Sequence, residues 1–576
     1  MDFNNYLLLK FDKKDNNFVL DYNLNTPVFF KNYDTHKIAI IGHLYINSLC
    51  GQGVVEKVYE LFNNKNYSKL ENLNGEFVVI IEYITDGKIY IINSRFASPH
   101  IFYYADDKSF FASNNYSLLI KELLKLNKVK LNSEAFWEVI YFRRLYTNKT
   151  LDNASKYLPG ASVLSWSITQ GIKIHKYWNI KYKHDYLSFS DGVHYLKNSL
   201  QTAIKNKQLD NKRNALMLSG GMDTRVLLSQ GKFDAAFTAT ITKNREYKVA
   251  KEVAKYKNIP HYWLNYKVEQ YSKYIDFSSA LIGSMFMADG VFYGFSNKIK
   301  SVCDVTFAGY GLDYFFQGMY LPTRKFYVKN KPLYFSLPLK KPPKNLSKYY
   351  LENISFRSKG VAVDDIMLAA GEMREYLEGE ISKDLAISKN FSDSWLDNWE
   401  FLNFGNVSRH YTYGGQLAHM EMCDYRTIAY DNEVYDVYLS VPNKYRYDSK
   451  LMRELLKISD TFLYNYISAN HGFPIKYSGL QKTIAHSFDF LKRKLFLKPK
   501  AKFERTWLEG DAVINTVLYD DILKLAKSET LAQLNIIDMD KLALAIENWK
   551  NKKIVGGQTF MMLLTVERFL NFIHDK

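Results

Sequence analysis

A glycine-rich loop that contains a carboxylate is the part of this sequence best suited to chemistry. Residues 218–224 read Leu-Ser-Gly-Gly-Met-Asp-Thr, with a strand-like apolar run before them and a helix-like apolar run after them. Adjacent glycines let the backbone approach a phosphate closely, and the start of a helix offers N–H groups that lack partners. Ser219 and Thr224 add hydroxyl donors, and Asp223 could hold a Mg²⁺ that bridges two phosphates. The pattern predicts a pyrophosphate cradle, with an ordinary glycine-rich turn as the alternative.

The spacing of this loop excludes two common phosphate-binding classes. It lacks the Gly-Lys-Ser/Thr ending of a Walker loop, and it is not a Gly-x-Gly-x-x-Gly dinucleotide fingerprint. It resembles instead the PP-loop, Ser-Gly-Gly-x-Asp-Ser/Thr, of the ATP pyrophosphatases, which cleave ATP between the α and β phosphates. A second segment, Gly309-Tyr310-Gly311-Leu-Asp313, also follows an apolar run and is similar to a motif of the asparagine synthetases. The chain therefore resembles the asparagine synthetase family, of the glutamine-hydrolysing type B.

This resemblance implies a complete nucleotide site that uses ATP and Mg²⁺. In the family two carboxylates bind the metal on ATP, which gives that role to Asp223 and Asp313 at the carboxyl ends of two strands. The residues implied to bind ATP are Leu218, Ser219, Gly220, Gly221, Asp223, Thr224, Gly309 and Gly311. Lys450 lies where the family keeps a lysine that neutralises pyrophosphate. Glu246 resembles a family glutamate on a helix, although a surface glutamate explains it equally well.

The first part of the chain follows the order of the N-terminal glutaminase domain of the same family. Short alternating apolar runs there predict the strands of a sandwich. We expect an αββα sandwich of the Ntn glutaminase type, an α+β fold, over residues 1–183. An α/β domain of the adenine nucleotide α-hydrolase type, an ATP-pyrophosphatase fold with a parallel sheet, is expected to follow over residues 190–576.

The residues that hydrolyse glutamine are missing from the expected sandwich. The family glutaminase uses a cysteine as its mature first residue, whereas Met1 is followed here by Asp2. The cysteines of the chain are Cys50, Cys303 and Cys423. Ile41 and His43 replace the Asn and Glu of the family's glutamine pocket, and Phe96 replaces its aspartate. We predict that glutamine is not hydrolysed; His43 as a new base is the alternative, and a packed histidine is favoured.

The composition fits a chain of two or three domains without a membrane span. A length of 576 residues exceeds what one core supports, and the three cysteines have neither disulfide nor metal spacing. No apolar stretch approaches roughly twenty residues and no signal-peptide core begins the chain, so a cytoplasmic protein is expected. The net charge of +17 comes largely from lysine spread along the sequence. Since no nucleic-acid-binding module appears, no nucleic-acid partner is expected.

A basic segment and three structural stretches complete the prediction. Residues 488–502 interleave aromatic and aliphatic side chains with six Lys or Arg residues. We interpret them as a core-packed helix with a solvated basic face that ends at Pro499; an anionic membrane surface or an acidic partner is the alternative. Residues 325–348, rich in lysine and proline, predict an exposed insertion. Residues 365–385 and 520–576 have helical apolar spacing.

The activity implied by the resemblance is an ATP-dependent, AMP-forming carbon–nitrogen ligase. A substrate carboxylate, from aspartate or a related acid such as a sugar acid, would attack the α-phosphorus of ATP and release pyrophosphate. Ammonia or an amine would then attack the acyl-adenylate, giving an amide and AMP. The partners are accordingly a small carboxylate and an amine. A peptide or polysaccharide-pathway substrate and a homodimer stay open.

Tyr310 leads to a second hypothesis. Asparagine synthetases usually carry glutamate at this position, whereas β-lactam synthetases have Gly-Tyr-Gly-x-Asp and pair the tyrosine with a glutamate to deprotonate an internal amine. The chain offers His410 in place of that glutamate, upstream of Asp424-x-Arg426, which resembles the family's Glu-x-Arg segment. Catalytic roles are thus expected for Tyr310 and Lys450. Three hypotheses remain: an ammonia- or amine-dependent ligase, an intramolecular cyclase of the β-lactam synthetase or lasso-peptide cyclase type, and a non-catalytic relative.

Overall fold

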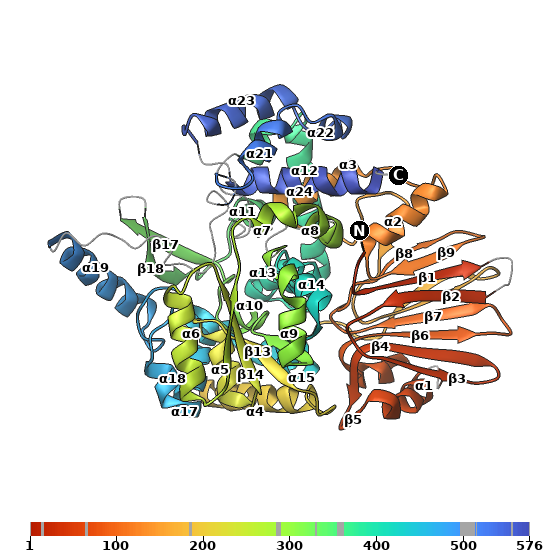
Figure 1. Cartoon of the computed structure of the whole chain (residues 1–576), viewed down its shortest axis with the longest axis horizontal. Coiled ribbons are helices and arrows are strands. Elements are labelled where there is room, and N and C mark those ends of the chain that lie inside the picture. Colours follow the sequence, from red (N-terminus) through yellow and green to blue (C-terminus); the bar gives the residue numbers. More distant parts are fainter. Residues whose placement is uncertain are drawn as a thin grey trace.

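Alternating apolar residues in the first part of the chain build two antiparallel sheets, seen at the right of Figure 1. In the computed structural model one sheet has the order β10-β8-β9-β1-β2, and the other has the order β12-β11-β7-β6-β4-β3 with β5 beside β4. Their strands are β1 (Tyr6–Asp12), β2 (Asn17–Asn23), β3 (Val28–Asn32), β4 (His36–Ile46), β5 (Leu49–Cys50), β6 (Asn74–Tyr83), β7 (Lys88–Asn93), β8 (Phe102–Ala105), β9 (Phe110–Ser113), β10 (Lys156–Tyr157), β11 (Ser162–Ser167) and β12 (Gly171–Lys176). The structure describes residues 2–12, 17–63, 67–183, 187–283, 290–328, 331–353, 362–495, 513, 515–554 and 557–574.

The two sheets pack face to face, and helices cover their outer faces. The inner faces meet in a core that contains Leu9, Ile41, Ile80 and Trp166, all buried. Helix α1 (Val55–Asn63) packs on the outer face of the second sheet, because its buried Val58 and Phe62 share a core with β4 and β6. Helix α2 (Tyr116–Lys125) packs on β8 and β9 of the first sheet, and α3 (Ser133–Phe142) follows it in the chain. The predicted αββα sandwich is therefore confirmed.

The second part of the chain is built on a parallel sheet of five strands in the order β15-β14-β13-β16-β19. These strands are β13 (Asn214–Met217), β14 (Ala235–Thr240), β15 (His261–Asn265), β16 (Val305–Ala308) and β19 (Asp424–Thr427). The chain runs outward from β13 on one side and returns to β16 on the other, so the strand order reverses between these two neighbours. Ligands of open α/β sheets bind at such a reversal, beyond the carboxyl ends of the strands. The predicted parallel-sheet fold is confirmed.

Helices surround this sheet, and α5, α6, α10 and α14 supply residues to the site described below. Their bounds are α4 (Phe189–Asn206), α5 (Asp223–Gln230), α6 (Arg245–Tyr256), α7 (Gln270–Lys273), α8 (Ile275–Ile282), α9 (Ser296–Val302), α10 (Leu312–Phe316), α13 (Trp395–Phe404), α14 (Tyr413–Met422), α15 (Asn432–Ser440), α16 (Asn443–Arg446), α17 (Lys450–Ser459) and α18 (Thr461–Asn465). No helix in the described ranges is long and apolar enough to cross a membrane.

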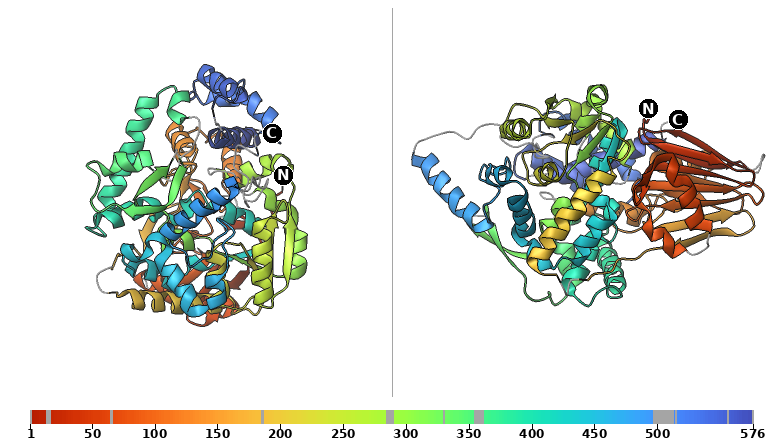
Figure 2. Two further views of the ribbon diagram at one scale, coloured as in Figure 1. Left: turned by 90° about the vertical axis from the view of Figure 1, so that its left-hand side faces the viewer. Right: turned by 90° about the horizontal axis from the view of Figure 1, so that it is seen from below.

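The expected insertion and helical stretches are also present. An antiparallel hairpin of β17 (Thr323–Val328) and β18 (Lys331–Pro338), followed by α11 (Leu346–Asn353), forms the insertion, and helix α19 (Gly479–Leu495) contacts this hairpin at the outer edge of the molecule (Figures 1 and 2). The stretch 365–385 lies largely in α12 (Ala370–Ser388). The last stretch forms α21 (Tyr519–Leu525), α22 (Glu529–Gln533), α23 (Met539–Lys550) and α24 (Gly557–His574). Helix α24 contacts both α3 and α8, so the end of the chain ties the two parts together.

Candidate nucleotide site

The loop between β13 and α5 is held in shape by its own hydroxyl groups. The Ser219 hydroxyl lies 3.0 Å from Thr224 Oγ1, and the Ser219 N–H donates to Thr224 Oγ1 at 3.1 Å. The Gly221 N–H donates to Ser219 Oγ at 3.1 Å. These bonds close the loop over the start of α5, where the positive end of the helix dipole favours an anion.

Gly220 is required because the loop passes close to its neighbours. A Cβ at this position would lie 2.4 Å from the Cβ of Ala469, and the Gly220 carbonyl accepts the N–H of Ala469 at 2.9 Å. The Gly220 N–H donates to Glu246 Oε1 at 2.6 Å. Glu246 is buried on α6, so the interpretation of this residue as a surface glutamate was wrong. Glu246 instead holds the loop in position through its hydrogen bond with the Gly220 N–H.

Asp223 and Asp313 lie next to each other at the point where the strand order reverses. Asp223 is the first residue of α5 after β13, and Asp313 lies in the first turn of α10 after the adjacent strand β16. The two loops approach so closely that a Cβ on Gly309 would lie 2.7 Å from Asp223 Cβ. Burial raises the pKa of both carboxyl groups, and the charge of Asp223 raises the pKa of Asp313 further. The Gln317 amide donates to Asp223 Oδ1 at 2.5 Å.

Such a pair of carboxylates fits a divalent cation. Two buried carboxylates that repel each other gain from a shared positive charge, and carboxylate oxygens are the ligands that Mg²⁺ prefers. Across the described ranges no group of three or more His, Cys, Asp or Glu side chains could hold a metal. Mg²⁺ commonly binds one or two carboxylates together with substrate phosphates, so Asp223 and Asp313 suffice for a metal that arrives with a nucleotide.

A cavity of about 270 Å³ opens above this loop and the two aspartates. Its described lining residues are Met217, Leu218, Ser219, Gly221, Asp223, Thr224, Phe237, Thr238, Ala239, Glu246, Ala308, Gly309, Tyr310, Asp313, His419 and Asn470. Two of the expected ATP-binding residues, Gly220 and Gly311, are not among them. Gly311 has a φ of +90°, and a Cβ there would lie 2.5 Å from the Cβ of Ala429, so its role is to let the backbone turn.

The cavity wall places a different histidine beside Tyr310 than the sequence suggested. The ring of His419, on α14, lies 6.0 Å from the ring of Tyr310 in an edge-on arrangement. His410 is buried elsewhere, with its ring 4.8 Å from that of Tyr314 and its Nδ1 2.9 Å from Thr412 Oγ1. The proposal of His410 as the partner of Tyr310 is therefore replaced by His419. Nothing in the sequence indicated that His419 lies on the buried face of α14.

Lys450 lies away from the cavity. It is the exposed first residue of α17, and its ammonium lies 4.8 Å from the ring centre of Phe189 on α4. The described lining of the cavity contains no lysine or arginine. Asn470, from the segment after α18, supplies a polar side chain to the wall instead. The resemblance assigned Lys450 to the pyrophosphate site because of its position at the start of a helical run. That position alone does not determine which way the side chain points.

The place of the family's glutamine pocket is nearly filled. A cavity of about 20 Å³ remains there, beside Ile41, His43 and Glu76, and it has room for about one water. His43 is buried, and burial lowers its pKa well below the usual range. Phe96, in place of the family's aspartate, stacks on Tyr430 with 5.1 Å between ring centres. Asp2, which follows Met1 where the family has its cysteine, is exposed and carries no thiol.

The thiols of the chain are also unsuited to nucleophilic attack. Burial raises the pKa of Cys303 and of Cys423 to about 12, and it raises the pKa of Cys50 to a smaller extent. The thiolate is the reactive form, so all three side chains are predominantly protonated and unreactive at neutral pH.

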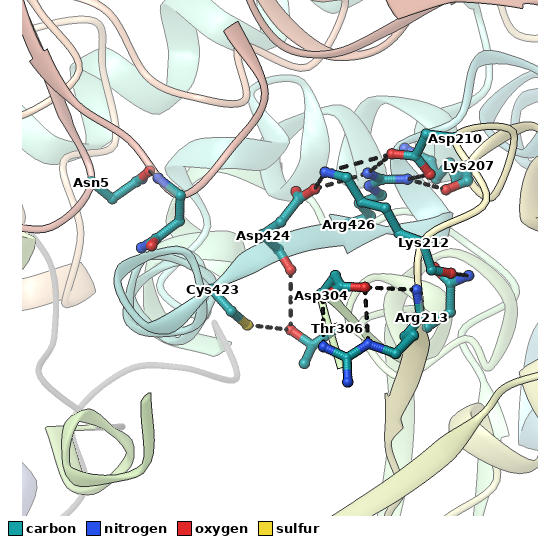
Figure 3. A network of polar contacts seen from close by, with 12 residues as sticks. Asn5, Lys207, Asp210, Lys212, Arg213, Asp304, Thr306, Cys423, Asp424 and Arg426 are labelled. Atoms are coloured by element: carbon teal, nitrogen blue, oxygen red, sulfur yellow. Dashed lines mark hydrogen bonds and ion pairs between the residues drawn. The ribbon is translucent and has the colours of Figure 1, made fainter. Parts of the chain in front are cut away.

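The Asp424-x-Arg426 segment joins the parallel sheet to the end of α4, as Figure 3 shows. Arg426, on β19, donates from Nη2 to Asp210 Oδ2 at 2.5 Å and to Asp424 Oδ2 at 2.8 Å. Lys212 Nζ lies 3.2 Å from the same oxygen of Asp424. Neither member of the segment is among the described residues that line the cavity. The network therefore positions β19 and does not contact a ligand there.

Next to this network a buried ion pair links the sandwich to the parallel-sheet part. Glu76 Oε2, on β6, lies 3.1 Å from Lys207 Nζ at the end of α4 and accepts the Thr427 N–H at 2.7 Å. The exposed fractions of the Glu76 and Lys207 side chains are 4% and 0%. The Thr427 hydroxyl in turn donates to Gln416 Oε1 on α14 at 3.1 Å. The helix that carries His419 is thus connected to the sandwich.

Comparison with known proteins gives one domain match and a number of weak structural similarities, two of which are described below. The family model described as "Asparagine synthase" matches residues 195–467. The solved structure of glutamine phosphoribosylpyrophosphate amidotransferase from B. subtilis, complexed with ADP and GMP, is 7% identical over 45% of this chain and 59% of its own, with a TM-score of 0.18. A structure described as the allosteric regulatory enzyme of purine biosynthesis is 8% identical over 42% of this chain and 48% of its own, with a TM-score of 0.16.

The chain spans about half the length of these two proteins, and similarity at this level carries no argument about its fold or its activity. No curated protein matches the chain. The domain match covers β13, β14, β15, β16 and β19 and both loops that carry the paired aspartates. The chain therefore contains an asparagine synthase domain over residues 195–467.

Proposed function

We propose that this protein is an ATP-dependent amide ligase that adenylates a carboxylate, transfers ammonia or an amine to it, and releases AMP and pyrophosphate. The observation that carries the proposal is the pair of Asp223 and Asp313 on two adjacent parallel strands, beside the glycine-rich loop. When bound, Mg²⁺ would neutralise these carboxylates together with the phosphates of ATP. The start of α5 favours the negative charge of the pyrophosphate.

The proposed reaction has two steps. An oxygen of the substrate carboxylate attacks the α-phosphorus of ATP, and the bond from that phosphorus to the bridging oxygen of pyrophosphate breaks. The nitrogen of ammonia or an amine then attacks the acyl carbon, AMP leaves, and the nitrogen loses a proton. Tyr310 and His419 line the cavity and are the proposed route for that proton. Burial lowers the pKa of His419 to about 4, so the imidazole is neutral at pH 7 and can accept a hydrogen bond.

Ammonia or an amine, rather than glutamine, is the proposed nitrogen donor. The near-closed pocket at His43 and the three protonated thiols support this choice. In this proposal the sandwich has kept its fold and its contacts with the second part while losing hydrolysis.

A second candidate is the closure of an amide within one molecule. Tyr310 and His419 side by side in the wall favour it, because an internal amine needs a proton acceptor at that place. The described wall also offers no Lys or Arg to pair with a second carboxylate, which disfavours free aspartate and favours a substrate whose remaining groups are neutral or cationic. The two candidates share the adenylation step and differ in where the nitrogen comes from.

Pyrophosphate release from Mg-ATP, with a panel of carboxylates and either ammonium or glutamine, tests the proposal. We expect turnover with ammonium or an added amine and none with glutamine alone, and a loss of at least about 100-fold in Asp223→Asn. Product mass without any added amine identifies the cyclase. Binding of Mg-ATP, measured by calorimetry, is independent of the acid chosen. A wild-type protein that binds Mg-ATP no better than Asp223→Asn would show that the pair of aspartates is not a nucleotide site.

A further inference from the structure

Helix α19 exposes the apolar face that the sequence analysis expected to be packed in a core. The exposed fractions of Leu480, Ile484, Phe488 and Leu491 are 53%, 48%, 69% and 55%. At roughly 100° per residue these four positions fall within an arc of about 80°, so they form one stripe along the helix. The interpretation of this segment as a core-packed helix was wrong over the residues that the structure describes, and Pro499 lies outside them.

The opposite side of α19 accounts for its contact with the rest of the chain. The Thr483 hydroxyl accepts the Phe335 N–H of β18 at 3.2 Å, and the ring of His486 lies 5.6 Å from that of Tyr334. The helix is therefore attached through one side to the β17–β18 hairpin. Figures 1 and 2 place it at the outer edge of the molecule, and the four residues of the apolar stripe are exposed there.

The charge around the stripe selects what could cover it. Residues 476–495 contain five Lys or Arg residues and a single acidic residue, Asp489. A second copy of the chain, docked through the same face by a two-fold axis, would bring two such basic segments together, and their repulsion disfavours it. A helix with Leu and Phe on one face and an excess of Lys and Arg is the pattern of helices that lie in the surface of an anionic bilayer.

We propose that α19 docks this protein on an anionic membrane surface. Leu480, Ile484, Phe488 and Leu491 enter the boundary between headgroups and acyl chains, and the excess of Lys and Arg in the sequence of 476–495 attracts anionic lipids. No described residue of α19 lines the nucleotide cavity, so docking leaves that cavity open to its substrates. The proposal is independent of which acid or amine the protein uses.

Sedimentation of the full chain with lipid vesicles tests this proposal. Vesicles of phosphatidylcholine alone are compared with vesicles in which phosphatidylserine replaces part of it, at low and at high salt. We expect binding to the anionic vesicles, weakened by salt because each Lys or Arg near the surface contributes about fivefold to binding. Phe488→Glu should lower the partition coefficient by about tenfold or more, because it removes a large apolar side chain from the stripe.

Leu544→Glu is the matched control, since Leu544 on α23 is 57% exposed and lies outside the stripe. It should bind vesicles as the wild type does. Far-UV circular dichroism and the unfolding temperature show whether each variant is folded, and Ile484→Glu repeats the test at a second position. Three results would each overturn the proposal: no binding to anionic vesicles at low salt, equal binding to neutral vesicles, or unchanged binding by both stripe variants. An acidic protein would then be the occupant to seek.

Discussion

Removing one partner of the buried ion pair between Glu76 and Lys207 should destabilise the protein strongly. The two side chains are buried, 3.1 Å apart, and belong to the two different parts of the chain. In Lys207→Met, Glu76 keeps the Thr427 N–H at 2.7 Å as a hydrogen-bond donor but loses its counter-charge. Leaving one buried charge without its partner costs about 3–5 kcal/mol. A loss of that size is a large part of the stability of an ordinary domain.

Replacing both partners should recover most of this loss. In Glu76→Gln/Lys207→Met the amide can still accept the Thr427 N–H, and no charge is left buried. A buried pair replaced as a whole by neutral groups is often neutral in stability, because both desolvation costs disappear with the attraction. We expect the double variant to lie within about 1–2 kcal/mol of the wild type. The difference between single and double variants is the coupling energy of the pair.

Guanidinium unfolding, followed by tryptophan fluorescence, measures these free energies, and Lys57→Met is the matched control. Lys57 and Glu60 form an ion pair 2.8 Å apart at the surface, with exposed fractions of 42% and 61%. Such a pair contributes about 0–1 kcal/mol. If Lys207→Met costs no more than Lys57→Met, or if the double variant is as unstable as the single ones, the reasoning from burial is refuted.

Three further predictions concern the site and the response to acid. Glu246→Ala leaves the Gly220 N–H without its acceptor at 2.6 Å. Because a lost hydrogen bond to a charged group costs about 1.5–3 kcal/mol, the dissociation constant of Mg-ATP, measured by calorimetry, should rise about 10-fold or more. Unchanged affinity would contradict the role given to this glutamate. Lys450→Ala should change the rate of pyrophosphate release less than about twofold, because the side chain is exposed beside Phe189; a loss of about 100-fold would show that the lysine reaches the site during turnover. Burial lowers the pKa of His100 to about 3, below the unfolded value of about 6.5, so its contribution to stability is full above pH 6.5 and is lost as the pH falls toward 3. His100→Asn should therefore reduce the loss of stability between pH 6 and pH 5 by about 1.4 kcal/mol, measured by guanidinium unfolding, and an unchanged slope would show that His100 takes up protons in the folded state.

The sequence predicted the parts of the site that the backbone carries. Gly220 and Gly309 lie where a Cβ would clash, and Asp223 and Asp313 each lie in the first turn of a helix after a parallel strand. Residue type and position along the chain decide these features, because a loop between a strand and a helix has few conformations. The alternation of apolar residues likewise predicted the two sheets, since period two matches the pleat of a strand.

The parts that the sequence did not predict depend on where side chains point after packing. His419 reaches the cavity from a helix whose buried face is set by packing, and Lys450 is exposed at the start of its helix. For Glu246 the sequence left a family match and a surface position open, and packing decided between them. For helix α19 the sequence did not predict that the apolar face would be exposed. Its amphipathic spacing predicted a helix, but whether the apolar face is buried depends on what the rest of the fold places against it.

The contacts of the sandwich give it a role in the fold that does not depend on glutamine hydrolysis. Glu76 accepts the Thr427 N–H at the end of β19, Thr427 donates to Gln416 on α14, and α14 carries His419 into the cavity wall. Removing the sandwich would leave Lys207 without its counter-charge and the end of β19 without an acceptor. The position of His419 therefore depends on a chain of hydrogen bonds that begins at Glu76 in the sandwich, whether or not glutamine is bound.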